Sequence, residues 1–191
     1  MFRRIFHRFF GPVAARLGYF RPHQSKKPRV VDELGQKNNL LMSFYSAVEE
    51  AGLKPKHIMD IGANRGTWAQ VARQTFPSAL ITMLEPQSWL QPSPQDLVNN
   101  DPNMLYFPVG AGRAAGSFSF TLAERDDSST FRLSKQEAES RGLEQREIPV
   151  VTLNGLIREK SLPVPEIVKI DAEGLDLDVL EGASDLFGKT E

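Results

Sequence analysis

Four acidic residues lie at the ends of apolar stretches of the sequence: Asp60, Glu85, Asp171 and Glu173. Each stretch is short and rich in Ile, Val, Leu or Met, which is the pattern of strands buried in a parallel sheet. Ligands bind outside the carboxyl ends of such strands, where a carboxylate can accept hydrogen bonds from a ligand or take up a proton. The spacing therefore predicts one ligand site made from the ends of several strands.

A turn of small residues follows the first of these acids and predicts a close approach of backbone to a ligand. Gly62 and Gly66 carry no side chain, and Asn64 tolerates the left-handed conformation better than most residues. Glu85 lies 23 positions after Gly62 and has two acceptor oxygens for ribose hydroxyls, as the acid about 20 residues past the turn has in dinucleotide folds. The turn reads GANRG, however, and lacks the GxGxxG of nicotinamide sites. These residues predict a nucleoside cofactor but depart from the dehydrogenase pattern.

Proton transfer in this chain falls to carboxylates, because its three histidines are poorly placed. His7 and His23 lie in the N-terminal segment, and His57 precedes the first strand, at the amino end of the sheet. Asp171 and Glu173 are therefore the predicted catalytic bases. An alternative stays open, in which these two acids only cap the following helix. Paired carboxylates could also hold Mg²⁺, but no third ligand is evident, so we predict no metal site.

Four motifs, in order along the chain, resemble those of the S-adenosylmethionine-dependent methyltransferases of the FkbM type. They are DIGANRG (60–66), LEP (84–86), VKIDAEG (168–174) and VLEGA (179–183). The resemblance covers about residues 55–187 and implies an α/β, Rossmann-like class I fold, a mostly parallel sheet with helices on both faces. It implies that S-adenosylmethionine is held by the glycine turn, the acid after the second strand and the serine-rich segment 126–130: Asp60, Gly62, Asn64, Gly66, Glu85 and Ser128. For the serine-rich segment two alternatives stay open, a solvated loop and contact with the acceptor.

The activity implied by the resemblance is methylation of a hydroxyl on a sugar, a glycan or a secondary metabolite. We therefore expect a small-molecule or glycan acceptor and no nucleic acid. Alignment of the reacting atoms supplies much of the acceleration in such a displacement, and a base assists a weakly nucleophilic hydroxyl. Two alternatives stay open: a non-catalytic protein that keeps the cofactor half without a complete acceptor pocket, and an NAD-linked enzyme.

The chain departs from the family pattern in three places. Asn154 replaces the usual Asp, and residues 88–94 contain two prolines where a helix is expected, which predicts an altered loop. The chain also ends 17 residues after Gly174, so we expect three C-terminal strands of the seven-stranded sheet to be absent. The strand ending at Asp171 would then be an open edge, and either the chain is a truncated form or a partner, such as a second copy, covers that edge.

The N-terminal segment differs from the rest in charge. Residues 1–30 contain eight Lys or Arg and no Asp or Glu. The whole chain has a formal net charge of −1, so residues 31–191 together carry −9. Aromatic and aliphatic residues recur there at helical spacing, as in an amphipathic helix that lies on a membrane surface. The alternative is a helix docked on its own domain or on a partner subunit, which is the commoner meaning of an apolar stripe. We predict a basic arm over residues 1–35 and a methyltransferase domain over 36–191.

Composition limits the remaining possibilities. At 191 residues and 40% hydrophobic content, the chain can bury one sizeable core, which predicts one domain besides the arm. It contains no cysteine, so neither disulfides nor thiolate zinc sites can form. No apolar run approaches 18 residues, so no transmembrane helix is predicted. We expect a cytoplasmic protein, with contact at the membrane periphery if the arm binds lipid.

Periodicity predicts the elements that position these residues. Strands are predicted over residues 57–62, 79–84, 104–109, 118–122, 150–153 and 167–171. Helices are predicted over residues 40–51, 67–76, 134–142 and 175–186. Lys169 faces the same side of its strand as Asp171 if that strand is regular.

Overall fold

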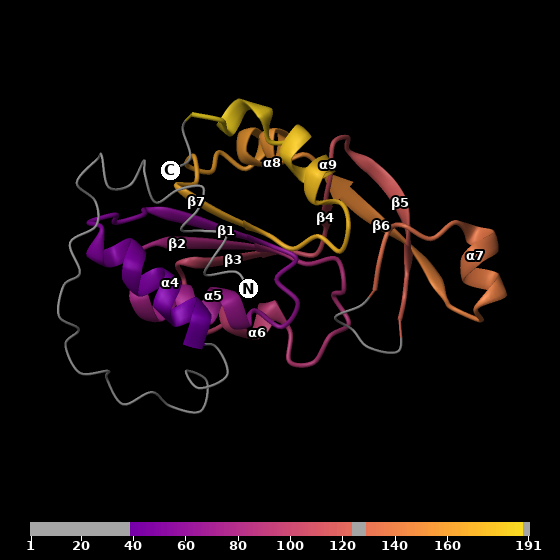
Figure 1. The fold of residues 1–191 in the computed structure, drawn as a ribbon, viewed down its shortest axis with the longest axis horizontal. Coiled ribbons are helices and arrows are strands. Elements are labelled where there is room, and N and C mark those ends of the chain that lie inside the picture. The colour runs from indigo at the N-terminus through magenta and orange to yellow at the C-terminus, as the bar shows by residue number, and fades with distance from the viewer. Residues whose placement is uncertain (1–38, 124–128, 189–191) are drawn as a thin grey trace, which may run out of the picture. The chain divides into compact units, whose positions relative to one another are not determined.

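The computed structural model describes residues 39–123 and 129–188, so the predicted arm and Ser128 lie outside the described residues (Figure 1). Its centre is a four-stranded parallel sheet in the order β3-β2-β1-β7. The strands are β1 (His57–Ile61), β2 (Leu80–Leu84), β3 (Met104–Phe107) and β7 (Ile167–Ile170). The predicted α/β, Rossmann-like fold is confirmed.

Helices cover both faces of this sheet (Figure 1). One face carries α4 (Asn39–Glu50), α5 (Thr67–Thr75) and α6 (Pro94–Val98). The other carries α8 (Leu153–Glu159), α9 (Asp176–Glu181) and the short 3-10 helix η2 (Ser184–Leu186). Within the described residues, no helix is long and apolar enough to cross a membrane.

The core lies on the two faces of β1 and β2. All five residues of β1 are buried, because both faces of a central parallel strand are covered by helices. On one face Met59 and Ile61 pack with Leu153, Leu156 and Val179 from α8 and α9. The continuous apolar run that predicted this strand is thus explained by burial on both sides.

A second, smaller sheet extends from the carboxyl side of the parallel sheet (Figure 1). It consists of β4 (Gly110–Ala111), β5 (Gly116–Thr121) and β6 (Gln145–Val151), in the order β4-β6-β5. Helix α7 (Lys135–Ser140) lies between β5 and β6 in sequence, and it begins with a capping box. In that box, Glu137 accepts from the backbone N–H of Ser134 at 2.9 Å.

Two helices were absent from the sequence-based prediction. Helix α8 begins after Thr152, whose side chain accepts from the N–H of Gly155, so the predicted strand ends earlier than expected. Helix α6 begins at Pro94, the second proline of the segment predicted to be an altered loop, and Ser93 caps it. Proline is tolerated in a first helical turn because its missing N–H has no partner there. The predicted helix over 175–186 is instead α9 followed by η2.

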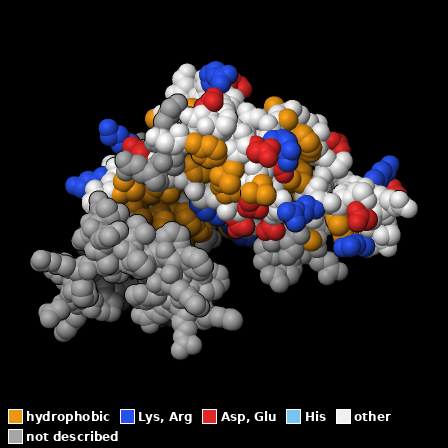
Figure 2. All heavy atoms as spheres, turned by 45° about the horizontal axis from the view of Figure 1, so that its top comes forward, with side chains coloured by type: hydrophobic (Ala, Val, Ile, Leu, Met, Phe, Trp, Pro, Cys, Tyr) orange, Lys and Arg blue, Asp and Glu red, His pale blue; other side chains and the backbone are white. Residues whose placement is uncertain are grey.

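The predicted open edge is present in the described part of the chain, where β7 pairs with β1 and with no other strand. The helix that follows β7, α9, exposes Leu177 and Leu180, at 73% and 39% of their surface. With the side of α8 and α9 turned forward, Figure 2 shows hydrophobic side chains among charged ones on that face.

Candidate functional site

The turn after β1 has the left-handed geometry expected from its residues. Gly62, Asn64 and Gly66 have φ angles of 72°, 47° and 74°. A Cβ at Gly62 would lie 1.9 Å from the backbone oxygen of Asp171, so no other residue fits without a shift. The backbone that approaches Gly62 closely is therefore that of Asp171, just after β7.

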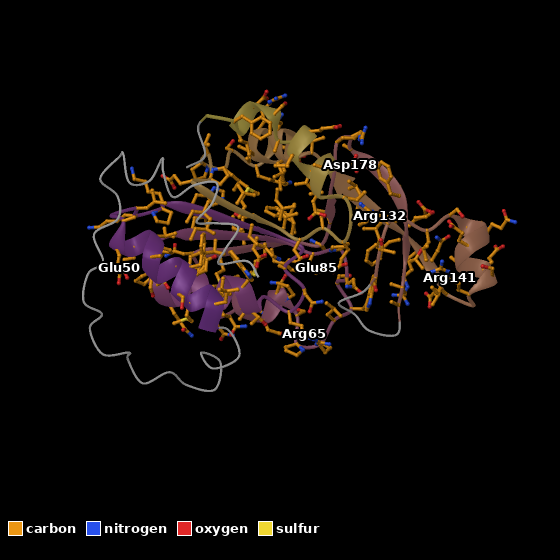
Figure 3. All side chains as sticks on the ribbon, in the orientation of Figure 1. Glu50, Arg65, Glu85, Arg132, Arg141 and Asp178 are labelled. Carbon is orange, nitrogen blue, oxygen red and sulfur yellow. The ribbon has the colours of Figure 1, made fainter. Side chains whose placement is uncertain are left out.

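Glu85 supports this turn from the end of β2. Its Oε2 accepts from the N–H of Asn64 at 2.8 Å, and its Oε1 accepts from the N–H of Gln87 at 2.9 Å. Only 4% of the residue is exposed, and burial raises the pKa of its carboxyl group, opposed by these backbone hydrogen bonds. The Gln87 side chain also hydrogen-bonds this carboxyl group. A carboxylate has about four acceptor positions, so these donors leave capacity for a ligand's hydroxyl. Figure 3 shows Glu85 near the carboxyl ends of the parallel strands.

Asp60 lies beneath the turn and is 1% exposed. Its Oδ1 is 3.0 Å from the Nζ of Lys169, which is 11% exposed. Burial raises the pKa of the Asp60 carboxyl, and the Lys169 ammonium acts against that rise. Asp60 was predicted to accept directly from ligand donors, but it faces Lys169 and does not line the cavity described below.

The end of β7 presents the two predicted bases. The side chain of Asp171 is 67% exposed, and its Oδ2 is 3.7 Å from the Nζ of Lys169. Glu173 has a left-handed φ of 48°, and its backbone oxygen accepts from the hydroxyl of Thr130 at 3.0 Å. Arg132 donates to the backbone oxygen of the next residue, Gly174, at 2.8 and 3.0 Å (Figure 3). Side chains from the segment after β5 thus fix the turn after β7.

The alternative role of Asp171 and Glu173 as helix caps is wrong. The N-cap of α9 is Leu175, and no side chain caps it. The acids in its first turn are Asp176 and Asp178. Both predicted bases therefore lie before the helix, at the mouth of the site.

A cavity of about 100 Å³ joins these strand ends. Of the predicted residues, Gly62, Asn64, Glu85, Asp171 and Glu173 line it, whereas Asp60 and Gly66 do not. Sequence reasoning did not assign a further set of lining residues to the site: Val109, Gly110, Phe120, Ser129 and Phe131.

Part of that further set carried a signal in the sequence. Ser129 belongs to the serine-rich segment 126–130, and it is buried, with its Oγ accepting from the N–H of Ala123 at 3.1 Å. Phe120 belongs to the alternating pattern that predicted β5. Phe131 packs on it with ring centroids 4.6 Å apart, a contact that no pattern in the sequence indicated.

Three further residues do not line the cavity. Trp68 packs against Tyr45 and Phe44 of α4. Trp89 lies under the guanidinium of Arg146, 4.3 Å from its ring centroid. Asn154 contacts Ser184 and the N–H of Asp185, and so joins α8 to η2.

Metal binding finds no support among the residues that the structure describes. They contain no group of three or more His or acidic residues that could hold a metal ion.

Comparison with known proteins places this arrangement in a family. None of the curated proteins compared with the chain matches it. The family described as Methyltransferase FkbM domain matches residues 60–190, from the acid at the end of β1 through η2. Because that match covers more than half of the sequence and the fold agrees with it, the chain belongs to the FkbM methyltransferase family.

Proposed function

We propose that this protein transfers a methyl group from S-adenosylmethionine to a hydroxyl oxygen of a small molecule or glycan. The observation that carries the proposal is the charge of the cavity. Glu85, Asp171 and Glu173 line it, and none of the described lining residues is a Lys or Arg. A site with this charge attracts a cationic ligand, such as a sulfonium, because opposite charges attract strongly where water is partly excluded.

The residues present suit such a donor. Glu85 retains acceptor capacity for a ribose hydroxyl, and the turn at Gly62 and Asn64 lets its backbone approach the ligand. When bound, the donor supplies an electrophilic methyl group activated by the positive sulfur.

The chain's own contribution to the chemistry comes from the end of β7. A sugar or alcohol hydroxyl is a weak nucleophile, so a carboxylate within reach accelerates its attack by accepting the proton. Asp171 has an exposed side chain and directly follows β7, and Glu173 lies in the turn that Thr130 and Arg132 fix. The acceptor therefore binds between this turn and the second sheet, where Phe120 and Phe131 provide an apolar wall.

The cavity charge argues against an NAD-linked enzyme. A dinucleotide carries a negatively charged pyrophosphate, which binds at backbone N–H groups of a GxGxxG turn or at basic residues. The observed turn lacks that sequence, and the described lining residues supply carboxylates in its place.

Calorimetric titration followed by a turnover assay tests the proposal. We expect the full chain to bind S-adenosylmethionine and S-adenosylhomocysteine and to show no binding of NAD. Incubation with labelled donor and a panel of glycans and alcohols should give a labelled ether. Donor binding without transfer to any acceptor would favour the non-catalytic alternative, and binding of NAD alone would overturn the proposal.

We also propose that a second copy of this chain covers the free edge of β7. An open strand edge favours association, and so do the exposed Leu177 and Leu180 on the helix that follows β7. Sedimentation velocity should then give a dimer that Leu177→Lys dissociates. A wild-type monomer at the highest concentration measured would contradict this proposal.

A further inference from the structure

Lys169 occupies an unusual position for a lysine, because its ammonium is almost entirely inside the protein. It projects from β7 toward β1, where Asp60 is its register partner in the parallel pair. The ring of Trp68 lies 5.9 Å from its Nζ. A lysine this buried needs partners for its charge and its N–H groups.

Those partners lie mainly in the turn after β1. The Nζ of Lys169 donates to the backbone oxygen of Gly62 at 2.7 Å and to that of Ile61 at 3.3 Å, and it pairs with Asp60 at 3.0 Å. The two backbone oxygens are its hydrogen-bond acceptors, and the contact with Asp60 is an ion pair between the buried charges. Asp171, at 3.7 Å, is beyond hydrogen-bond distance.

We infer that Lys169 is a positioning residue for the methyl donor, holding the Ile61–Gly62 backbone in its ligand-binding form. This inference rests on the proposed function, because it takes the turn at Gly62 as the donor site. Two neighbouring charged residues then have different roles. Lys169 supports donor binding, and Asp171 takes part in proton transfer. Asp60 compensates the charge of Lys169 from below.

Lys169→Met tests the inference, because methionine keeps a similar length and removes the charge and all donors. We expect the dissociation constant for S-adenosylhomocysteine to rise by about tenfold or more, the equivalent of losing one hydrogen bond to a charged group. The turnover number at saturating donor should change far less. A purely structural loss would lower the active fraction and the maximal rate while leaving the donor dissociation constant unchanged. Lys160→Met is the matched control, since Lys160 pairs with Glu159 on the surface of α8.

A double variant separates positioning from charge compensation. Lys169→Met leaves Asp60 as a buried carboxylate without its cation, which destabilises the fold. Asp60→Asn combined with Lys169→Met removes both charges, so the melting temperature should recover while donor affinity stays low. Recovery of both would overturn the inference, because it would mean that Lys169 only neutralises Asp60.

Hydrogen exchange of the ligand-free protein keeps this test independent of the donor. In Lys169→Met, amides of residues 61–66 should exchange faster, while those of β2 should keep their wild-type rates. Unchanged exchange at residues 61–66 would overturn the role of Lys169, even if the donor binds. Failure of the wild-type chain to bind the donor would refute the proposed function, and the exchange result would still decide whether Lys169 holds the turn.

Discussion

The two ends of β1 each carry a buried ionisable group, but hydrogen bonds satisfy the one at the amino end and an ion pair compensates the one at the carboxyl end. At the amino end, His57 is fully buried, with Nδ1 2.7 Å from the oxygen of Pro163 and Nε2 2.9 Å from the hydroxyl of Thr82. At the carboxyl end, Asp60 depends on the ion pair with Lys169, next to the exposed carboxylate of Asp171.

From this difference we infer that the amino end is structural and propose that the carboxyl end is functional. A carbonyl oxygen can only accept, so Nδ1 of His57 carries the proton and Nε2 accepts from Thr82, which satisfies a neutral ring completely. The other end keeps charged groups beside the cavity, and shifted titratable groups of this kind gather where ligands bind. Removing groups from the two ends should therefore affect different measurements.

The largest effect is expected at the end of β7. Asp171→Asn or Glu173→Gln, whichever removes the base, should lower turnover by roughly 10²- to 10⁴-fold, with donor affinity nearly unchanged. Steady-state kinetics and calorimetry on the same samples measure the two quantities. Asp178→Asn is the control (Figure 3). Asp178 lies on α9, pairs with Arg113 and does not line the cavity. Equal losses of turnover and affinity would assign these acids to donor binding.

A smaller effect, on donor affinity, is expected at Glu85. Glu85→Ala removes an acceptor for a ribose hydroxyl and also the partner of the Asn64 N–H, so binding should weaken by roughly 1.5–3 kcal/mol. Isothermal titration with S-adenosylmethionine measures this. Glu50→Ala, at the exposed end of α4, should leave affinity unchanged (Figure 3). A folded Glu85→Ala protein with wild-type affinity would remove Glu85 from the donor site.

The comparison also shows what the sequence could and could not predict. The left-handed turn at Gly62 and Asn64 and the acids at the strand ends were predictable, because each depends on neighbours in sequence. The placement of His57 at the amino end of the sheet was predicted and is confirmed. The contact of Lys169 with Asp60 depends on the register of two strands more than 100 residues apart, which no local pattern specifies.

Other features were missed for a related reason. Helix α8 is short and begins two residues after β6 ends. The predicted strand over residues 150–153 therefore contains the end of β6 and the start of α8. The cavity wall at Phe131 requires the segment after β5 to fold back on the parallel sheet. Long-range packing of this kind is absent from periodicity.

At the structural end of β1, a conservative change should affect stability alone. Thr82→Val keeps the shape of the side chain and removes the hydroxyl that donates to Nε2 of His57, leaving a buried acceptor without its partner. The free energy of unfolding should fall by roughly 1–3 kcal/mol, measured by denaturant titration. Donor affinity of the folded protein should stay at its wild-type value. A loss of affinity without a loss of stability would contradict the division of roles between the two ends.

The smallest expected effect is a dependence of stability on pH that originates at His57. Burial lowers the pKa of His57 below its usual 6.5, outweighing the contacts with Pro163 and Glu166. The unfolded chain therefore gains a proton as the pH falls through 6.5, while the folded chain does not, so the free energy of unfolding falls until the lower folded pKa is reached.

Burial raises the pKa values of Asp60 and Glu85. Their effect on the free energy of unfolding has the opposite sign, because an acid with a raised folded pKa makes the protein less stable as the pH rises. The difference between wild type and His57→Gln isolates the histidine, because both proteins keep the two acids. Between pH 7.5 and about 5.5, this difference should shrink as the wild type loses stability, because Gln cannot gain a proton. Parallel curves for the two proteins would show that His57 takes up its proton equally in the folded and unfolded chains, and the amino end of β1 would then lack a histidine that burial keeps neutral.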